Sequence, residues 1–197
     1  MKERPIIFSG PMVRAILDGK KTQTRRVLKP QPKNYIIQSP DDGLFYDAES
    51  INAGKLVKCP FGAIGDRLWV RETWQQTRPK RSGGRFTLRT PQQGCGDLHY
   101  TASTETFDEE PPKWRSPRFM PRWASRLTLE ITDVRVQWLQ GITLKDVAAE
   151  GVADVAEFIQ LWDNLNYLRG HGWSSNPWVW VIAFRRSGDE IREVDGR

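Results

Sequence analysis

A short stretch rich in basic and hydroxyl side chains, LDGKKTQTRRVL at residues 17–28, holds the groups best suited to chemistry. Lys21 and Thr24 lie three residues apart, where a predicted helix runs into a predicted strand. If Lys21 is buried beside Arg25 or Arg26, desolvation and like charge both lower its pKa. A neutral amine can then take a proton from the Thr24 hydroxyl, or from a water that Thr24 holds, for attack on a carbonyl. The alternative is a solvated basic turn without catalytic function.

Such a pair also needs a carboxylate, and the sequence offers two candidates. Glu150 occupies the last turn of a predicted short helix, where the helix dipole disfavours an anion, so that a nearby cation must compensate it. Glu72 shares a predicted strand face with Leu68 and Val70, so it points inward and also needs a cation. For each glutamate, a structural salt bridge is the alternative to a functional role.

Tryptophans next to basic residues form a second pattern that bears on function. Aromatic and cationic side chains together can stack on and hold nucleobases. Core tryptophans covered by the stems of arginines produce the same sequence pattern. The tryptophans concerned are Trp69, Trp74, Trp114 and Trp123.

Charge and composition limit the partners. The formal net charge of +6 and the sequence pI of about 9.5 favour anionic ligands or polyanions. The two cysteines cannot form a disulfide framework. One cysteine and one histidine have a possible zinc-ligand spacing that the other two could complete, but nothing else in the sequence arranges them, so we expect no metal and no cofactor. The residues concerned are Cys59, Cys95, His99 and His171. No apolar run is long enough to cross a membrane, so a cytoplasmic protein without membrane contact is expected. Nothing indicates an oligomeric state.

The elements that must position these residues can be predicted from periodicity and from turn and capping residues. Strand, helix and strand are expected over residues 4–28, and a turn at Gly65-Asp66 followed by a further strand over 63–74. The stretch 125–139 is a long strand whose apolar positions change phase near Asp133, which indicates a bulge in a curled sheet. Two helices and a closing strand are predicted over 143–186. The order points to an α+β fold, a small mixed β-barrel with flanking helices.

Two loop-rich insertions, at about residues 29–60 and 75–122, interrupt this pattern. In the first, only YIIQ and LFYD can pair as short strands, and in the second LHYTAS is a candidate strand. The predicted organisation is a single domain over residues 1–186, followed by a polar tail at 187–197.

The stretch GKKTQTRR resembles the signature of the ASCH domain family through Gly19, Lys21, Thr24 and Arg26. Three other stretches are also similar to that family: GDRLWVRE, ITLKDVAAEG and WVWVIAF. The resemblance covers roughly residues 4–28, 62–74 and 124–186, and it implies a PUA-like β-barrel. The two insertions lie outside it and look like those of larger, phage-type members.

The resemblance also implies a function, although the family is functionally mixed. Some small bacterial members are amidohydrolases that remove acyl groups from the exocyclic nitrogen of cytidine, as in N4-acetylcytidine. Carried over to this sequence, their catalytic set is Lys21, Thr24 and Glu150. In the mechanism that we expect, Arg26 and Glu72 line the substrate pocket and Trp69 stacks on the cytosine ring; these three complete the predicted site. Either Thr24 or a water is the nucleophile.

Two alternatives follow from the same features. A non-catalytic RNA-binding module would bind RNA with a steep salt dependence and would be indifferent to Thr24→Ala. A ribonuclease would depend on Lys21 or Arg26 and would not turn over free nucleosides. The expected partner is therefore a small nucleoside substrate, with RNA as the alternative.

Overall fold

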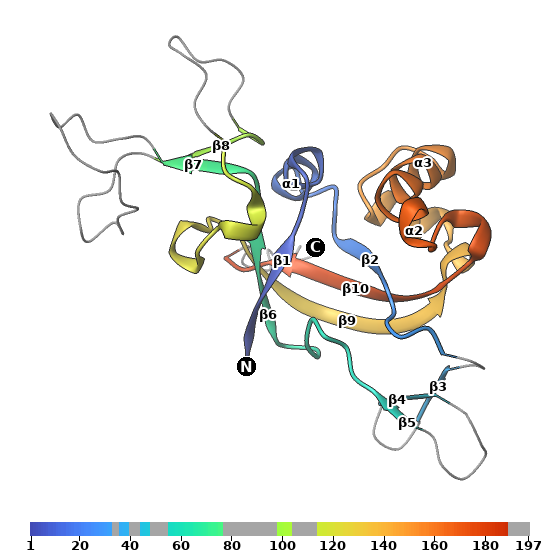
Figure 1. Cartoon of the computed structure of the whole chain (residues 1–197). Helices are drawn as coiled ribbons and strands as arrows, with labels where there is room; N and C mark the ends of the chain where they lie inside the picture. The colour runs from blue at the N-terminus through green and yellow to red at the C-terminus, as the bar shows by residue number, and fades with distance from the viewer. Residues whose placement is uncertain (33–35, 40–43, 48–54, 77–97, 104–113, 189–197) are drawn as a thin grey trace, which may run out of the picture.

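The computed structural model describes residues 1–32, 36–39, 44–47, 55–76, 98–103 and 114–188, and these form a mixed α+β fold (Figure 1). A five-stranded sheet lies at its centre. Its strand order is β1-β6-β9-β10-β2, in which β1 and β6 run parallel and the other neighbours run antiparallel. The five strands are β1 Glu3–Ile7, β6 Arg67–Arg71, β9 Thr128–Trp138, β10 Trp178–Arg186 and β2 Gln23–Val27.

The predicted α+β class is confirmed, but strand pairing does not close a barrel within the described part of the chain. β1 and β2 are the two edges of the sheet, and each pairs on one side only. The sheet is strongly curled (Figure 1). A side chain links its edges, because Arg26 Nη2 donates a hydrogen bond of 2.7 Å to the carbonyl of Ile7, the last residue of β1. The chain between β1 and β2 forms helix α1, Gly10–Leu17.

The long strand β9 carries the bulge predicted near Asp133. Along the β9–β10 ladder, Ala183 pairs with Asp133 and the next residue, Phe184, pairs with Ile131. Thr132 is therefore the extra residue, and it shifts the alternation of side chains by one position. As a result Leu129 and Ile131 before the bulge, and Val134 and Val136 after it, face the same core.

Strand β10 is buried on both faces, as its apolar sequence predicted. Trp180 and Ile182 belong to the core that contains Phe8 and the inner face of α1. Val179 and Val181 pack on the opposite face, against a cluster that includes residues of α3. Because β10 pairs with β2, the same two environments extend to β2, which carries the candidate catalytic residues.

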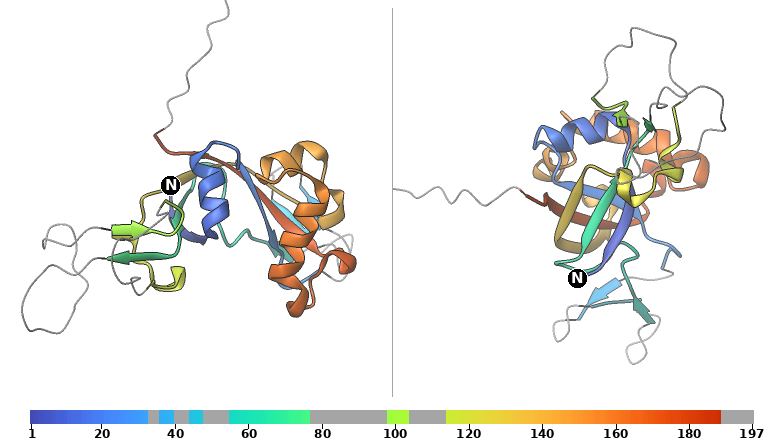
Figure 2. Two further views of the ribbon diagram at one scale, coloured as in Figure 1. Left: turned by 90° about the horizontal axis from the view of Figure 1, so that it is seen from above. Right: turned by 90° about the vertical axis from the view of Figure 1, so that its left-hand side faces the viewer.

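The three α-helices begin and end at the residues that the sequence predicted. Helix α1 follows Ser9 and is succeeded by Gly19, which has a φ of +71°. Helix α2, Leu144–Ala149, begins with a complete capping box between Thr143 and Asp146. Helix α3, Val155–Asn166, is capped by the Asp154 side chain. Seen from above, α1 lies between the β7–β8 pair and the helices α2 and α3 (Figure 2).

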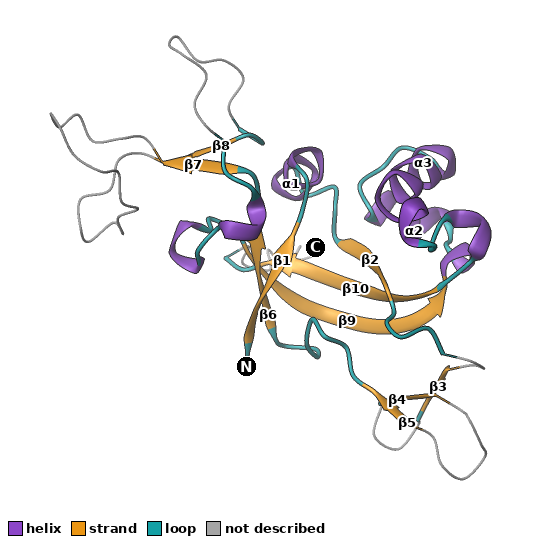
Figure 3. Cartoon of the chain, viewed as in Figure 1, coloured by secondary structure: helices purple, strands orange, loops and turns teal. Residues whose placement is uncertain are grey.

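Short elements complete the described structure (Figure 3). The predicted pairing of YIIQ with LFYD is confirmed, and an unpredicted strand, β5, adds to it; LHYTAS supplies β8. The short strands are β3 Ile36–Gln38, β4 Phe45–Asp47, β5 Lys55–Val57, β7 Trp74–Gln76 and β8 Leu98–Tyr100. The 3₁₀ helices are Pro117–Phe119, Arg122–Ala124, Leu139–Gly141, Tyr167–Arg169 and Trp173–Ser175.

Two further predictions concern the C-terminal tail and membrane-spanning segments. The predicted polar tail lies outside the described residues from position 189 onward. Among the described residues, no helix is long and apolar enough to cross a membrane.

Candidate active site

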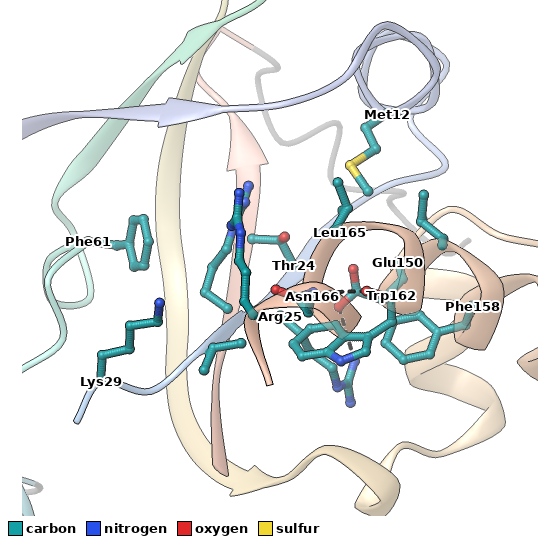
Figure 4. A pocket seen from close by; sticks show the side chains of 14 residues that line it. Met12, Thr24, Arg25, Lys29, Phe61, Glu150, Phe158, Trp162, Leu165 and Asn166 are labelled. Atoms are coloured by element: carbon teal, nitrogen blue, oxygen red, sulfur yellow. Dashed lines mark hydrogen bonds and ion pairs between the residues drawn. The ribbon is translucent and has the colours of Figure 1, made fainter. Parts of the chain in front are cut away.

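The candidate site lies at the β2 edge of the sheet, in a cavity of about 240 Å³ (Figure 4). Thr24 and Arg26 share one face of β2, and Arg25 lies on the other. Because β2 is an edge strand, side chains from both faces reach the same cavity. Helix α3 supplies its apolar wall through Phe158, Leu161, Trp162 and Leu165. Its polar lining residues are Thr24, Arg25, Arg26, Lys29, Glu150, Asn166 and Arg169.

Lys21 and Glu150, predicted separately from the sequence, meet in a buried ion pair. Lys21 Nζ donates to Glu150 Oε2 at 2.8 Å and to the Glu150 backbone carbonyl at 2.7 Å. The two side chains are 0% and 5% exposed. Glu150 is the C-cap residue of α2, so Lys21 is the cation that the helix dipole argument required.

Gly151 allows this close approach. Its φ is +78°, and a Cβ placed on it would lie 2.9 Å from Lys21 Cβ. Both the left-handed conformation and the contact require glycine at this position. The turn after α2 therefore brings the backbone of Glu150 against Lys21.

The pKa of Lys21 is shifted in the direction that the sequence predicted. Burial is the main cause and lowers the pKa of the Lys21 amine below its ordinary value. The Glu150 carboxylate opposes this shift, whereas the charges of Arg26 and Arg25 add to it. Lys21 is thus closer to a neutral amine than a solvated lysine would be.

Arg25 is a site residue that sequence reasoning did not identify as one. Its side chain is fully buried, and its Nη1 donates to Glu150 Oε1 at 3.1 Å. Its Nη2 lies 3.1 Å from Asp146 Oδ2, and its guanidinium lies 5.8 Å from the ring centre of Phe158. The Glu150 carboxylate is therefore shared between Lys21 and Arg25. Alternation along the predicted strand gave no signal for Arg25, because it placed Thr24 and Arg26 on the inward face and Arg25 on the other.

Asp146 extends the network toward solvent. Arg135 Nη2 donates to Asp146 Oδ1 at 2.6 Å, and the same nitrogen donates to Gln23. Burial alone would raise the pKa of Asp146, but hydrogen bonds from Thr143 and the charge of Arg25 outweigh it and lower the pKa from 3.8 to about 2. Asp146 therefore stays ionised and connects the cap of α2 to β2.

This shift predicts a pH dependence of stability. Because the folded-state pKa lies below the unfolded-state value, Asp146 stabilises the fold above about pH 4, and the contribution disappears as the pH falls through about 2. We expect Asp146→Asn to lower the free energy of unfolding at pH 7 by about 2 kcal/mol, and to flatten its change between pH 4 and 2. Urea denaturation at pH 7, 4 and 2 measures the free energy of unfolding for wild type and variant. Asp133→Asn, which removes a more exposed partner of Arg135, is the control; equal pH dependence in wild type and Asp146→Asn would contradict the prediction.

Thr24 shares the cavity with Glu150. The two side chains come from the strand and from the end of α2, and both project into the cavity (Figure 4). Among the described residues, none forms a hydrogen bond with the Thr24 hydroxyl, so this group is free to contact a ligand or a water. Lys21 is not a lining residue, and it is connected to the cavity through its contact with Glu150.

Two residues of the predicted site do not line this cavity. Glu72 is 1% exposed and accepts hydrogen bonds from Arg126 Nε at 2.8 Å and Nη2 at 2.9 Å. Trp69 on β6 is covered by Arg71 and Arg122, whose guanidinium carbons lie 4.5 and 5.9 Å from its ring centre. The inward position of Glu72 and its need for a cation are as predicted. Its partner, however, belongs to a different part of the fold from Lys21.

Arginines also cover a second tryptophan. Trp74 is fully buried, and the Arg115 guanidinium lies 5.8 Å from its ring centre. Its ring packs edge-on against Trp123. For Trp69 and Trp74, the basic and aromatic pattern therefore reflects core tryptophans capped by arginines and not an open stacking surface.

Loss of the Glu72 carboxylate should be costly for stability alone. Glu72→Gln removes a buried carboxylate and leaves Arg126, whose side chain is 26% exposed, without its counter-ion, so we expect the free energy of unfolding to fall by about 2 kcal/mol. Ligand binding in the cavity at β2 should be unchanged because Glu72 does not line it. Urea denaturation followed by tryptophan fluorescence measures the first effect. A loss well below 1 kcal/mol would show that the pair contributes little.

No zinc site is evident in the described part of the chain. Among those residues, no group of three or more His, Cys, Asp and Glu side chains is placed to hold a metal ion. Cys95, one of the four residues considered from the sequence, lies outside the described ranges.

Comparison of the chain with models of protein families, with curated proteins and with solved structures found no match.

Proposed function

We propose that the protein is an amidohydrolase that removes acyl groups from the exocyclic N4 of cytidine-type nucleosides, with Lys21, Thr24 and Glu150 as its catalytic residues. The observation that carries the proposal is the buried contact of Lys21 with Glu150, next to a cavity that Thr24 and Glu150 both line. The resemblance of GKKTQTRR to the ASCH signature supports it. The curled α+β sheet is compatible with the PUA-like architecture of that family, although strand pairing leaves it open in the described residues.

The hydrogen bonds of Lys21 suit a general base. A neutral amine has two N–H donors and one lone pair. The backbone carbonyl and the carboxylate of Glu150 accept two hydrogen bonds from Lys21 Nζ, which leaves one position on the nitrogen. In the neutral form that position is the lone pair, which can accept a proton from the Thr24 hydroxyl or from a water that Thr24 holds. Its lowered pKa makes this form more accessible.

Arg25 provides a counter-ion for the Glu150 carboxylate when Lys21 is neutral. A buried carboxylate beside an uncharged amine would otherwise lack a counter-ion. Because Arg25 Nη1 binds the second oxygen of Glu150, the carboxylate keeps a cationic partner whichever protonation state Lys21 adopts. Arg25 is therefore a positioning residue for Glu150.

The proposed reaction has two proton transfers, one from the nucleophile to Lys21 and one to the leaving amine. Thr24 Oγ, or a water beside it, attacks the acyl carbonyl carbon while Lys21 takes the proton of the attacking hydroxyl. The C–N bond then breaks, and the leaving N4 amino group receives a proton from the Lys21 ammonium or through Glu150. If Thr24 is the nucleophile, water hydrolyses the resulting acyl ester in a second step. The products are the cytidine and the free carboxylic acid.

A second cavity of about 290 Å³ offers room for the acyl group. Glu150, Met12 and Leu161 line both cavities, so the two adjoin at the proposed catalytic carboxylate. The second cavity lies between α1 and α3, with Ala15 and Val152 in its lining. We place the nucleoside in the first cavity and the acyl chain in the second.

This placement predicts that substrate preference can be changed from α1. Ala15→Leu should fill part of the second cavity, so KM for N4-hexanoylcytidine should rise about tenfold, as expected for crowding of apolar groups, while KM for N4-acetylcytidine changes little. Steady-state kinetics with both substrates measure the ratio. Ala156→Leu adds the same side chain at an exposed position of α3 and is the control. Equal effects on both substrates would contradict the placement.

The experiment that tests the function separates it from its two alternatives. Purified protein is incubated with N4-acetylcytidine, and cytidine and acetate are quantified by chromatography. Equimolar release of both supports the amidohydrolase. If neither N4-acetylcytidine nor N4-hexanoylcytidine is consumed, the proposal fails. Salt-dependent RNA binding without turnover would then favour the binding module, and cleavage of RNA would favour the ribonuclease.

A further inference from the structure

The first cavity carries more positive charge than the proposed reaction needs. Its described lining residues include four cations, of which Arg25 is already paired with the carboxylates of Glu150 and Asp146, so three cations make no ion pair with a described residue. The cations are Arg25, Arg26, Lys29 and Arg169. A neutral nucleoside would leave this charge uncompensated. An anionic group on the ligand would balance it.

Donors in the cavity wall are also left without acceptors. Arg26 Nη2 donates to Ile7, but Arg26 Nε is buried and has no hydrogen-bond partner within the described residues. Arg25, whose side chain is fully buried, has one nitrogen in the same condition, Nε, because its Nη2 is ion-paired with Asp146. Buried donors without partners are costly, so ligand oxygens that accept from them would stabilise a complex.

The cations are arranged along the cavity and not only around the catalytic residues. Lys29 lies five residues beyond Thr24 in the chain, just after the end of β2, and it is exposed. In Figure 4, Lys29 and Phe61 lie on one side of Thr24, and Glu150 and Trp162 lie on the other. A ligand that places its reacting group at Glu150 therefore extends past Thr24 toward Lys29.

Arg169 adds a second exposed cation to the same lining, from the 3₁₀ helix that follows α3. Arginine and lysine together are well suited to a phosphate, which accepts bidentate hydrogen bonds from a guanidinium and a point contact from an ammonium. The cavity volume of about 240 Å³ is small and suits a single nucleotide better than several.

We propose that this cavity binds the phosphate of a nucleotide through Lys29 and Arg169, so that the preferred substrate is an N4-acylated cytidine monophosphate and not the free nucleoside. This inference rests on the proposed function for the reaction, but the binding of the phosphate itself does not. Arg26, between Thr24 and Lys29 along the chain, supplies a donor to the middle of the ligand.

A binding measurement tests the inference independently of turnover. Titration calorimetry compares cytidine 5′-monophosphate with cytidine on wild-type protein and on the double variant Lys29→Gln/Arg169→Gln. We expect the monophosphate to bind the wild type at least about tenfold more tightly, as charge-assisted phosphate contacts imply, and this preference to fall to about twofold or less in the variant. Lys145→Gln, an exposed lysine outside both cavities, should keep the full preference.

Different failures have different meanings in this design. Equal affinity of the wild type for cytidine and its monophosphate would overturn the inference, even if N4-acetylcytidine is hydrolysed. A preference that persists in the double variant would overturn the assignment to Lys29 and Arg169. Much tighter binding of a cytidine-containing trinucleotide than of the monophosphate would overturn the inference that the ligand is a single nucleotide, and would favour RNA. Monophosphate preference without any hydrolysis would leave the phosphate site in place and remove the proposed function.

Discussion

Glu150→Gln should lower the free energy of unfolding by about 3–5 kcal/mol and abolish turnover of N4-acetylcytidine. The reason for the first effect is that Lys21 and Arg25 share this carboxylate in a buried site, and its loss leaves Lys21 without a counter-ion beside Arg25, which keeps only Asp146. The reason for the second is that Lys21 would lose the acceptor that orients its amine. Urea denaturation and ultraviolet assays of N4-acetylcytidine measure the two effects.

Glu72→Gln is the matched control for this change. It also removes a buried carboxylate bound to an arginine, but far from the cavity lining. It should therefore cost stability while turnover by the folded protein is retained. If Glu150→Gln does not fold, Lys21→Met provides the test, because Glu150 keeps Arg25 as its partner. Full activity in a folded Glu150→Gln or Lys21→Met protein would contradict the assignment of this pair.

Thr24→Ala should reduce kcat by about a thousandfold and leave stability within about 1 kcal/mol of the wild type. The hydroxyl forms no hydrogen bond with a described residue, so its removal breaks no internal contact of the folded protein. In the proposed mechanism the hydroxyl instead acts on the substrate or on the attacking water. Loss of such a group lowers kcat. Steady-state kinetics and thermal denaturation on the same preparation measure both quantities.

Thr24→Ser and Thr24→Val separate chemistry from packing. Serine keeps the hydroxyl and should retain a substantial part of the activity, whereas valine keeps the shape and should be as inactive as alanine. Substantial activity in Thr24→Val would mean that the hydroxyl is not required. Thr24 would then be a lining residue, and a water activated by Lys21 alone would be the nucleophile.

The elements that carry the candidate site were predictable because their signals are local. Thr143, Asp146 and Gly151 cap and end α2, and this placed Glu150 at the helix end. The position of Glu150 then required a cation on electrostatic grounds alone, and the structure supplies Lys21. The bulge in β9 followed from the phase change of apolar residues near Asp133.

The features that were missed depend on how distant elements meet. Alternation along β2 placed Thr24 and Arg26 inward and left Arg25 unassigned, but helices on the second face of the sheet bury Arg25 as well. Sequence patterns do not show which elements cover a face. For the same reason Trp69 and Glu72, which are both buried, were grouped with a cavity that they do not line.

The closure of the sheet was also beyond the reach of local patterns. A curled sheet and a closed barrel share the same strand and bulge signals, and they differ only in whether the two edges pair. Here a side-chain hydrogen bond from Arg26 to Ile7 spans the edges β2 and β1.

The most direct test of the central claim is the ultraviolet spectrum of N4-acetylcytidine over time, with wild-type protein, Thr24→Ala and Glu72→Gln side by side. We expect the band of the acylated base to disappear with the wild type and with folded Glu72→Gln, and to persist with Thr24→Ala. Loss of the band at the same rate with Thr24→Ala, or no loss with the wild type for the acetyl and hexanoyl substrates and their monophosphates, would contradict an amidohydrolase that acts through Lys21, Thr24 and Glu150.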